Sequence, residues 1–344
     1  MSTLVENVAK VTAAHAALKT AIAAKGVAVP DGTKLTGMPA LVDAIQTGGT
    51  TEPTNARACF SADDYAGGLV VPKTMVVDMT AIDNLKYFFY DCQAITSLEL
   101  PVGFGQNATS LYYCFYNCKA LTSLTLPANL GKIATNLNAC FYACAAMTSL
   151  ELPAGFGQAA TNLANCFFQC GSLTSLTLPD GFGNAATDFT NCFFSCVSMT
   201  SLTLPANFGQ AAANLGSCFH DCVNLTALAL PDGFGQNATS LYNCFYSCTK
   251  LTSLHLPAGF GQNSTNNTGC FDNCPALTDI TGNPNFKASL SLLKSSRLTH
   301  DSLMIVINGL QTVEGKTLTL GTTNLAKLTD EEKKVATDKG WTLA

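Results

Sequence analysis

Charged residues and histidines are scarce in this chain, and each shortage excludes a class of function. Only 12% of the 344 residues are charged, and the formal net charge is -5 at pH 7. Such a chain offers phosphate no basic stripe, so we expect no nucleic-acid partner. The sequence holds only four histidines, which are few for a series of zinc sites. Because 47% of the residues are hydrophobic, the chain has the material for a large folded core.

Long apolar runs and a secretory leader are also missing. Glycine, proline, serine or threonine interrupts every apolar run before it reaches the length of a membrane-spanning helix, so we expect no membrane insertion. The segment after Met1 lacks the basic start, apolar middle and small-residue cleavage site of a secretory signal. We therefore expect synthesis in a cytoplasm without a signal peptide.

A period of 26 residues runs through the middle of the chain. It is marked by the prolines Pro101, Pro127, Pro153, Pro179, Pro205, Pro231 and Pro257. It is marked again by seven cysteine pairs, Cys114/Cys118, Cys140/Cys144, Cys166/Cys170, Cys192/Cys196, Cys218/Cys222, Cys244/Cys248 and Cys270/Cys274. Phe88 and Cys92 form an eighth, imperfect unit. A fixed period of this length predicts a solenoid, in which each unit buries its apolar face by stacking on its neighbours.

Each unit begins with a short strand and a turn. Leu124 and Leu126 alternate as the inward residues of a strand do, and Pro127 ends that strand. Two residues after the proline we expect a left-handed turn, because Gly and Asn tolerate positive φ. This slot holds Gly103, Asn129, Gly155, Gly181, Asn207, Gly233 and Gly259.

The returning segment of each unit has a helical spacing. Leu163, Cys166, Phe167 and Cys170 stand at positions i, i+3, i+4 and i+7, which is one face of a short helix. We therefore expect short helical turns on the side of the solenoid opposite the strands.

The pattern L-x-x-L-x-L-P followed by a Phe-x-x-Cys return resembles the BspA-like leucine-rich repeats over roughly residues 87–281. The resemblance implies an α/β solenoid with a parallel β-sheet on one face, used for adhesion and recognition. The unit departs from the usual repeat in being longer and in carrying a cysteine before the phenylalanine as well as after it. We expect about eight repeats, capped at both ends.

The first 50 residues read as a helical attachment segment. Apolar residues at heptad spacing across residues 4–22 favour either a homo-oligomeric coil or packing on the body. Residues 51–86 read as a linker and N-terminal cap. Residues 5–45 are similar to N-terminal segments of bacteriophage tail-associated and fibre proteins. That resemblance implies docking on a virion.

The period ends near residue 281, and residues 282–344 read as a C-terminal α/β cap. We expect a helix over residues 301–310 and a strand over residues 316–320. Thr329 and Glu332 predict a capping box that opens a last, charged helix ending near Gly340. Solenoids need such caps because a bare terminal coil exposes its core and its strand edge.

The paired cysteines have three interpretations. A small apolar residue repeated on the same face as Leu and Phe favours a core-filling ladder. Disulfides remain an alternative, because neighbouring coils stack about 4.7 to 4.9 Å apart, within the range of a bridge. Metal ligation is the third, although the spacing does not match the usual zinc motifs. We expect no metal and no cofactor.

Catalytic motifs are missing. The sequence has no G-x-S-x-G, P-loop or H-E-x-x-H pattern. Acidic residues occur singly in different slots of the repeat, although two from distant units could still form a paired-carboxylate site. We expect a protein that is not an enzyme and has no catalytic residues.

The candidate ligand-binding residues follow the core phenylalanine of each unit. This slot reads Tyr116, Tyr142, Phe168, Phe194, His220, Tyr246 and Asp272, with Tyr112 and Tyr242 close by. If the slot faces outward, stacked aromatics supply rigid contact area for a ligand. The alternative is that the rings pack between adjacent coils. A second candidate surface is the ribbon of Ser, Thr and Glu side chains on the outward face of the strands.

These observations favour a non-enzymatic recognition protein. From the N-terminal resemblance we expect a receptor-binding protein of a phage tail, which contacts a bacterial surface glycan or protein. The alternatives are a bacterial cell-surface adhesin of the same repeat family and a structural spacer without a ligand.

Overall fold

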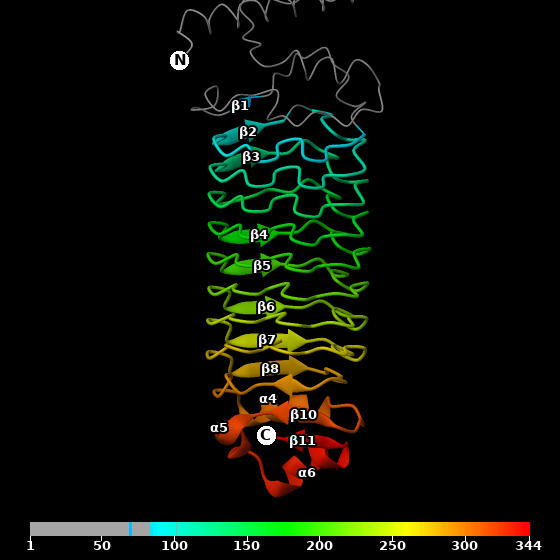
Figure 1. The fold of residues 1–344 in the computed structure, drawn as a ribbon, viewed down its shortest axis with the longest axis vertical. Helices are drawn as coiled ribbons and strands as arrows, with labels where there is room; N and C mark the ends of the chain where they lie inside the picture. Colours follow the sequence, from blue (N-terminus) through cyan, green and yellow to red (C-terminus); the bar gives the residue numbers. More distant parts are fainter. Residues whose placement is uncertain (1–68, 71–82, 101) are drawn as a thin grey trace, which may run out of the picture.

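A computed structural model of the protein describes residues 69–70, 83–100 and 102–344. The described part is a straight stack of coils that is closed at one end by the C-terminal elements (Figure 1). The solenoid and its 26-residue period are confirmed, since Ser97 pairs with Ser123 and Ser175 with Ser201. Our predictions for the oligomerising segment at residues 4–22 and for the phage-like segment at residues 5–45 lie outside the described residues.

Short parallel strands form one side of the stack. They are β1 (Leu69–Val70), β2 (Ser97–Glu99), β3 (Ser123–Thr125), β4 (Ser175–Thr177), β5 (Ser201–Thr203), β6 (Ala227–Ala229), β7 (Ser253–Leu256) and β8 (Asp279–Gly282). The hydrogen-bonded groups are β1-β2-β3, β4-β5 and β6-β7-β8. In β3, β4 and β5 the central leucine is buried and its two neighbours are exposed, as the alternation predicts.

A second parallel ladder, which the sequence analysis did not predict, runs half a coil away from the strands. It is one bridge wide in each coil and joins Ser110, Asn136, Asn162, Asp188, Asn214, Ser240 and Asn266. The Leu111 amide donates to the Asn136 carbonyl across this ladder at 2.9 Å. Neighbouring coils are therefore held together at this ladder as well as at the strands.

The returning segments are not helical, so our prediction of short helical turns is wrong. Leu163, Cys166, Phe167 and Cys170 are all buried, but Asn165 and Gln169 between them have left-handed backbones. Successive amides there donate in two alternating ways. The Cys166 amide donates to the Leu163 carbonyl three residues earlier, which closes a β-turn, and the Phe167 amide donates to the Cys192 carbonyl of the next coil. In a helix every amide would instead donate to a carbonyl of its own coil. Bonding to the neighbouring coil wins because the neighbour repeats the same geometry.

The turn after the proline is left-handed at six of its seven positions. Asn207 is the exception, since it is absent from the residues with positive φ. The second glycine of the turn is also left-handed, and in Gly131 it meets a further constraint. A Cβ built on Gly131 would lie 2.6 Å from the Phe156 ring of the next coil. Glycine is required there both by its backbone and by the ring packed against it.

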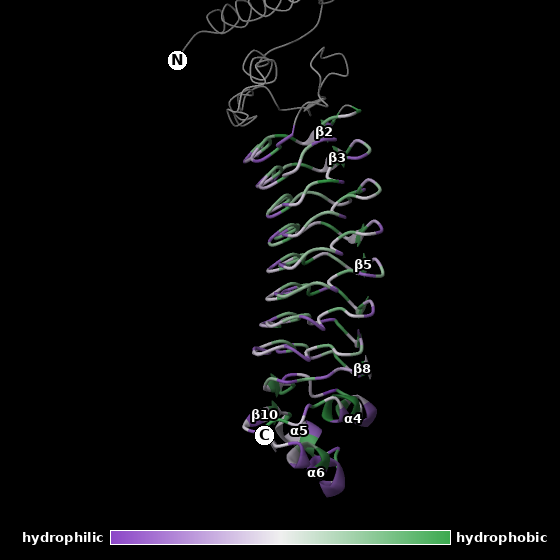
Figure 2. Cartoon of the chain, turned by 90° about the vertical axis from the view of Figure 1, so that its right-hand side faces the viewer, coloured by the Kyte–Doolittle hydropathy of each residue, from purple (hydrophilic) through white to green (hydrophobic). Residues whose placement is uncertain are grey.

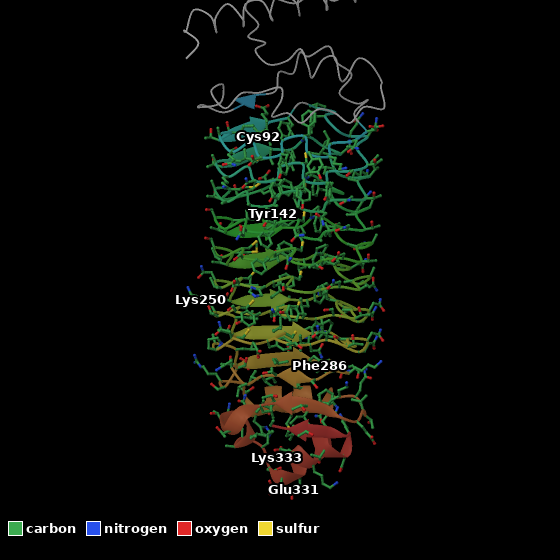
Figure 3. The ribbon with its side chains drawn as sticks, in the orientation of Figure 1. Cys92, Tyr142, Lys250, Phe286, Glu331 and Lys333 are labelled. Carbon is green, nitrogen blue, oxygen red and sulfur yellow. The ribbon has the colours of Figure 1, made fainter. Side chains whose placement is uncertain are left out.

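Side chains fill the interior of the coils (Figure 3), and stacked phenylalanines are prominent among them. One column runs through Phe115, Phe141, Phe167, Phe193, Phe219, Phe245 and Phe271. Adjacent rings of this column lie 5.3 to 5.6 Å apart and within 11° of parallel. A second column contains Phe156, Phe182, Phe208, Phe234 and Phe260. The core is thus one continuous body along the whole stack.

The C-terminal cap contains β9 (Leu290–Ser291), α4 (His300–Asn308), β10 (Lys316–Thr319), α5 (Gly321–Leu325), α6 (Asp330–Asp338) and β11 (Trp341–Leu343). The predicted elements at residues 301–310, 316–320 and after Thr329 are confirmed. Thr329 and Glu332 form the predicted capping box. The cap closes one end of the stack of coils (Figure 2).

Contacts between the cap and the last coil protect an edge of the sheet. The Ser302 hydroxyl of α4 accepts from the Ile280 amide of β8 at 2.9 Å. The Gln311 amide group donates to the Gln262 carbonyl at 2.9 Å. The cap therefore satisfies backbone groups that a bare last coil would leave without partners.

Candidate binding surface

The predicted aromatic residues form one stacked column on the returning side of the coils. We call it the aromatic column, and it contains Tyr90, Tyr116, Tyr142, Phe168, Phe194, His220 and Tyr246. Neighbouring ring centroids lie 4.4 to 4.8 Å apart and the rings are within 22° of parallel. The sequence analysis missed Tyr90, although it stands 26 residues before Tyr116.

The ring faces in this column are occupied by each other. Each inner ring is half-buried and has another ring stacked on both faces, as Tyr142 has Tyr116 at 4.6 Å and Phe168 at 4.4 Å. A sugar that binds by stacking needs an open ring face. The column therefore offers a ligand ring edges and tyrosine hydroxyls, and of the two arrangements left open by the sequence, packing between coils is the one present.

The other two predicted residues do not join the column or each other. Tyr112 is half-buried, with its ring centroid 4.4 Å from that of Tyr113. Tyr242 is 45% exposed. The two occupy the same slot five coils apart, which is about 24 Å at the usual spacing of parallel strands. They cannot contact the same small ligand.

A tyrosine cluster surrounds Tyr113 near the start of the described repeats. The Tyr113 ring lies 5.5 Å from Tyr87 and 4.8 Å from Tyr116. Burial and the neighbouring Tyr112 raise the pKa of Tyr113 to about 12. The Lys86 ammonium stands 5.4 Å from the Tyr87 ring centre. The phenol of Tyr113 therefore stays neutral at physiological pH and supplies no base.

His220 is the one imidazole in the aromatic column. It lies between Phe194 at 4.4 Å and Tyr246 at 4.7 Å, with its Nδ1 3.2 Å from an Asp221 carboxylate oxygen. Burial lowers the pKa of His220, and Asp221 opposes that shift. A neutral imidazole at physiological pH behaves as one more aromatic ring of the stack.

The paired cysteines form two columns in the core, which confirms the predicted ladder. The first column holds Cys114, Cys140, Cys166, Cys192, Cys218, Cys244 and Cys270, and the second holds Cys92, Cys118, Cys144, Cys170, Cys196, Cys222, Cys248 and Cys274. All these thiols are buried and free in the structure. Cys59 lies outside the described residues.

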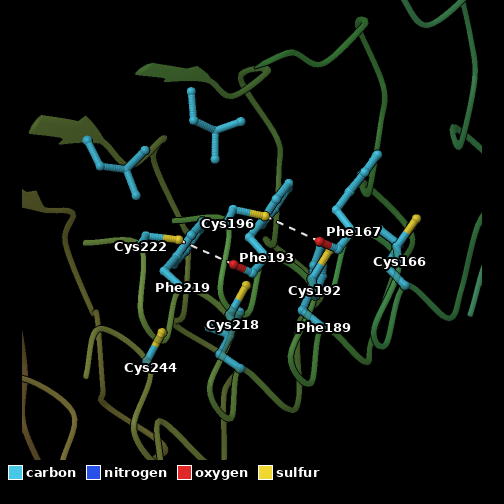
Figure 4. Packing of buried hydrophobic residues seen from close by; sticks show 14 of the residues in the cluster. Cys166, Phe167, Phe189, Cys192, Phe193, Cys196, Cys218, Phe219, Cys222 and Cys244 are labelled. Atoms are coloured by element: carbon cyan, nitrogen blue, oxygen red, sulfur yellow. Dashed lines mark hydrogen bonds between the residues drawn. The ribbon is translucent and has the colours of Figure 1, made fainter. Parts of the chain in front are cut away.

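Each thiol of the second column from Cys118 onward has a specific partner, which the sequence analysis did not foresee. It donates to the carbonyl of a core phenylalanine 29 residues earlier, at 3.1 to 3.2 Å. Figure 4 shows Cys196 with Phe167 and Cys222 with Phe193. The second cysteine therefore fills space and also adds a second hydrogen bond to a buried carbonyl, since the Phe167 carbonyl already accepts from the Cys170 amide at 3.2 Å.

The buried thiols are not suited to chemistry. Burial raises the pKa of Cys170 and of Cys222 to about 12. Nucleophiles and metal ligands need the thiolate, which these positions disfavour. Among the described residues no group of three or more His, Cys, Asp or Glu is arranged to hold a metal ion.

The outward face of the strands is covered with hydroxyl groups. Thr96, Thr122, Thr148, Thr174, Thr200, Thr226, Thr252 and Thr278 form what we call the strand-side threonine column. Within the strands themselves, exposed pairs such as Ser123 with Thr125 and Ser175 with Thr177 stand beside it. This face is polar, nearly uncharged and repeats with every coil.

A second column of threonines accompanies the second ladder. It holds Thr109, Thr135, Thr161, Thr187, Thr239 and Thr265, all of them exposed. We call it the second-ladder threonine column. The stack thus carries the same side chain on two separate parts of its surface.

The repeat matches a known protein family. The model of the BspA type leucine rich repeat region matches residues 80–215 and 163–295 in six copies. The chain belongs to this family. The match spans the coils described above, and the resemblance found in the sequence is confirmed.

Solved structures with similarity to this BspA-type chain come from bacteria. A leucine-rich repeat protein of T. pallidum is 16% identical, with a TM-score of 0.32, covering 70% of this chain and 82% of that one. A leucine-rich cell surface protein of Faecalibacterium prausnitzii is 14% identical, with a TM-score of 0.24, covering 56% and 61%. A leucine-rich repeat protein of Bacteroides ovatus is 14% identical, with a TM-score of 0.23, covering 68% and 71%. No curated protein matches the chain.

These matches do not support the resemblance of residues 5–45 to phage tail proteins. In the described part of this BspA-type chain, no helix has the length and apolar character needed to cross a membrane.

Proposed function

We propose that the chain is a non-enzymatic recognition protein of a bacterial cell surface, an adhesin that binds a surface glycan or protein through the outside of its solenoid. The cell-surface adhesin, which stood as an alternative in the sequence analysis, replaces the phage tail protein as the leading interpretation. Family membership supports it, because the resemblance implied adhesion and recognition.

The observation that carries the proposal is the order of the solenoid's surface. Side chains of one type recur at one coil spacing, and many are held by bonds to the preceding coil, as Thr161 is by the Thr135 carbonyl at 3.2 Å. Fixed side chains lose little entropy when a partner binds. A partner that spans several coils meets the same group repeatedly, so weak contacts add up.

The chemistry of the described residues also favours binding over catalysis. The pKa values of the buried thiols are raised, and the aromatic column holds a histidine whose pKa burial lowers. Neither provides an activated nucleophile with a base beside it. The acidic residues remain spread over different coils.

The test is binding of the purified full chain to a panel of Gram-positive and Gram-negative cells and to a glycan array. Saturable binding to cells, competed by one array ligand or by one extracted surface protein, is expected. No saturable binding to any cell or array component would overturn the proposal and favour a spacer.

A variant tests whether the aromatic column takes part. Replacing Tyr116, Tyr142 and Tyr246 together by Phe removes the hydroxyls at the ring edges but keeps the stack, since Phe168 and Phe194 already occupy this column. A loss of binding places recognition on the column edges. Unchanged binding places it elsewhere on the solenoid, and the hydroxyl face of the strands is then the remaining candidate.

A further inference from the structure

The strand-side threonines repeat one contact from coil to coil. The hydroxyl of Thr122 donates to the Thr96 carbonyl at 2.9 Å, and that of Thr200 donates to the Thr174 carbonyl at 3.2 Å. Thr174, Thr252 and Thr278 make the same bond at 3.0 to 3.4 Å. A β-branched side chain has one torsion that sets the position of its hydroxyl. This bond therefore fixes the exposed oxygens of Thr122, Thr174, Thr200 and Thr252 in the same orientation.

The bond also decides what these hydroxyls can offer a ligand. A threonine hydroxyl has one hydrogen to donate and two lone pairs that accept. Because the hydrogen is used inside the stack, the lone pairs are what remains for a partner. The column thus presents hydrogen-bond acceptors, one in each bonded coil, at multiples of about 4.7 to 4.9 Å.

The charges beside the column act in the same direction. Glu151 is exposed at the position that Thr125 and Thr177 hold in their coils. Carboxylates also accept and do not donate, and they repel anions. The whole chain carries a net charge of -5. An anionic polymer therefore meets repulsion on this face, and the bonded threonines of the column have no hydrogen left to donate to it.

We propose that the strand-side threonine column, between Thr122 and Thr252, binds an uncharged polysaccharide that lies along the stack and donates its hydroxyl hydrogens to the threonine oxygens. Neighbouring serines such as Ser123 and Ser175 are exposed or partly exposed and can donate or accept. A neutral polysaccharide supplies a donor on every sugar unit and carries no charge for Glu151 to repel. The inference rests on the proposed function and names the class of ligand.

Two sets of substitutions test it on the full chain. Thr122, Thr174 and Thr200 together to Val keep the branched shape and remove the acceptors, whereas the same three to Ser keep the oxygens. The matched control is Thr135, Thr161 and Thr187 to Val. These three make the same bond to the preceding coil in the second-ladder threonine column. Circular dichroism and thermal unfolding verify that each variant is folded.

Binding is measured by affinity electrophoresis and calorimetry against neutral polymers (a β-glucan, a mannan and a dextran) and anionic ones (alginate, heparin and polyphosphate). We expect a neutral polymer to bind and the anionic ones not to. The strand-side Val variant should bind at least about tenfold more weakly, since three hydrogen bonds are lost. The Ser variant and the second-ladder control should stay within about threefold of the unchanged chain, since their strand-side acceptors remain.

Preference for an anionic polymer would overturn the inference, as would binding to a surface protein alone, and both would leave the proposed recognition function standing. Equal loss in the Val and Ser variants, or in the second-ladder control, would also overturn it. Absence of binding to every polymer and every cell would overturn the proposed function as well. The choice between neutral and anionic polymers is made on the unaltered chain, so it does not depend on any variant folding.

Discussion

The repeats at residues 87–281 and the cap at residues 282–344 achieve order in different ways. In the repeats most contacts join like residues in adjacent coils, such as Phe167, Phe193 and Phe219. In the cap they join unlike residues, often within one turn, as in the capping box of Thr329 and Glu332. Three helices lie in the cap, and the described repeats contain none.

The difference shows where local signals decide a structure and where neighbours do. A helix in the cap carries its own start signal and its own ion pairs, such as Lys333 with Asp330 at 3.2 Å. A coil in the repeats has no such signals and depends on the coils above and below. We therefore expect changes in the repeats to be costly and changes at the cap's helix ends to be mild.

The largest effect is expected from the core of the repeats. Phe193→Ala removes a fully buried ring between two stacked rings, and the expected loss is about 3 to 5 kcal/mol of unfolding free energy. Chemical denaturation measures it, and Phe193→Leu, with a smaller cavity, should lose less. A loss below about 1 kcal/mol for the alanine variant would show that neighbouring coils close the gap, which contradicts a tightly stacked core.

A sharper test compares the two cysteine columns within one coil. The Cys196 thiol donates to the Phe167 carbonyl, so Cys196→Ser keeps a donor for that oxygen. Among the described residues Cys192 makes no such bond, and Cys192→Ser buries a hydroxyl among apolar side chains. We expect Cys192→Ser to be the more destabilising by about 1 to 3 kcal/mol. Equal stability of the two variants in denaturant would show that the carbonyl bond contributes nothing.

The cap's last helix gives a smaller effect. Thr329→Ala removes the hydroxyl that accepts from the Glu332 amide at 3.2 Å, and about 1 kcal/mol should be lost. Thr329→Ser is the control, because it keeps that oxygen. If Thr329→Ala lowers the unfolding temperature as much as Phe193→Ala does, the two regions do not differ in the way described above.

The smallest effect is a pH dependence of the cap. Hydrogen bonds to Glu332 and then to Asp301 raise the pKa of His300 from its ordinary 6.5. The stability that protonated His300 contributes to the folded state is therefore fully present below about pH 6.5 and is lost as the pH rises through the pKa of the folded protein. Bonds to Thr329 and His300 lower the pKa of Glu332, so its share is lost only in acid.

His300 is exposed and Glu332 lies half-buried at the surface, so the change should be slight and should weaken with salt. Unfolding temperatures on either side of neutral pH measure it, with His300→Gln as the control. A fall in stability with rising pH that persists in the glutamine variant would assign the effect to other groups.

Several particular features were predictable because residues one period apart in a repeat sequence pack against each other. Leu124 inward, Pro127 at the strand end, the buried cysteine columns and the capping box at Thr329 all follow from spacing. The helical returns were wrong because i, i+3, i+4, i+7 spacing fits any tight winding with one buried side. Asn165 and Gln169 could have warned of left-handed turns only if the bonds to the next coil had been known.

The aromatic column was predictable in its residues, whereas the packing of its ring faces was not. The aromatic slot was found by position, and its missing member Tyr90 follows from the same period. Whether ring faces point at solvent or at each other depends on how closely the coils stack. In the structure the ring centroids of Tyr142 and Phe168 lie 4.4 Å apart. No single coil holds that information.

The sequence by itself determined the repeat length and the residues that face inward, because these depend on which side chains avoid water along one chain. The tertiary structure alone decided which threonine hydroxyls already donate to the preceding coil, to which carbonyl each second-column thiol donates and which ring faces are covered. Those depend on the coil above and the coil below, since a donor or a ring face is spent only when a neighbour lies within a few ångströms of it.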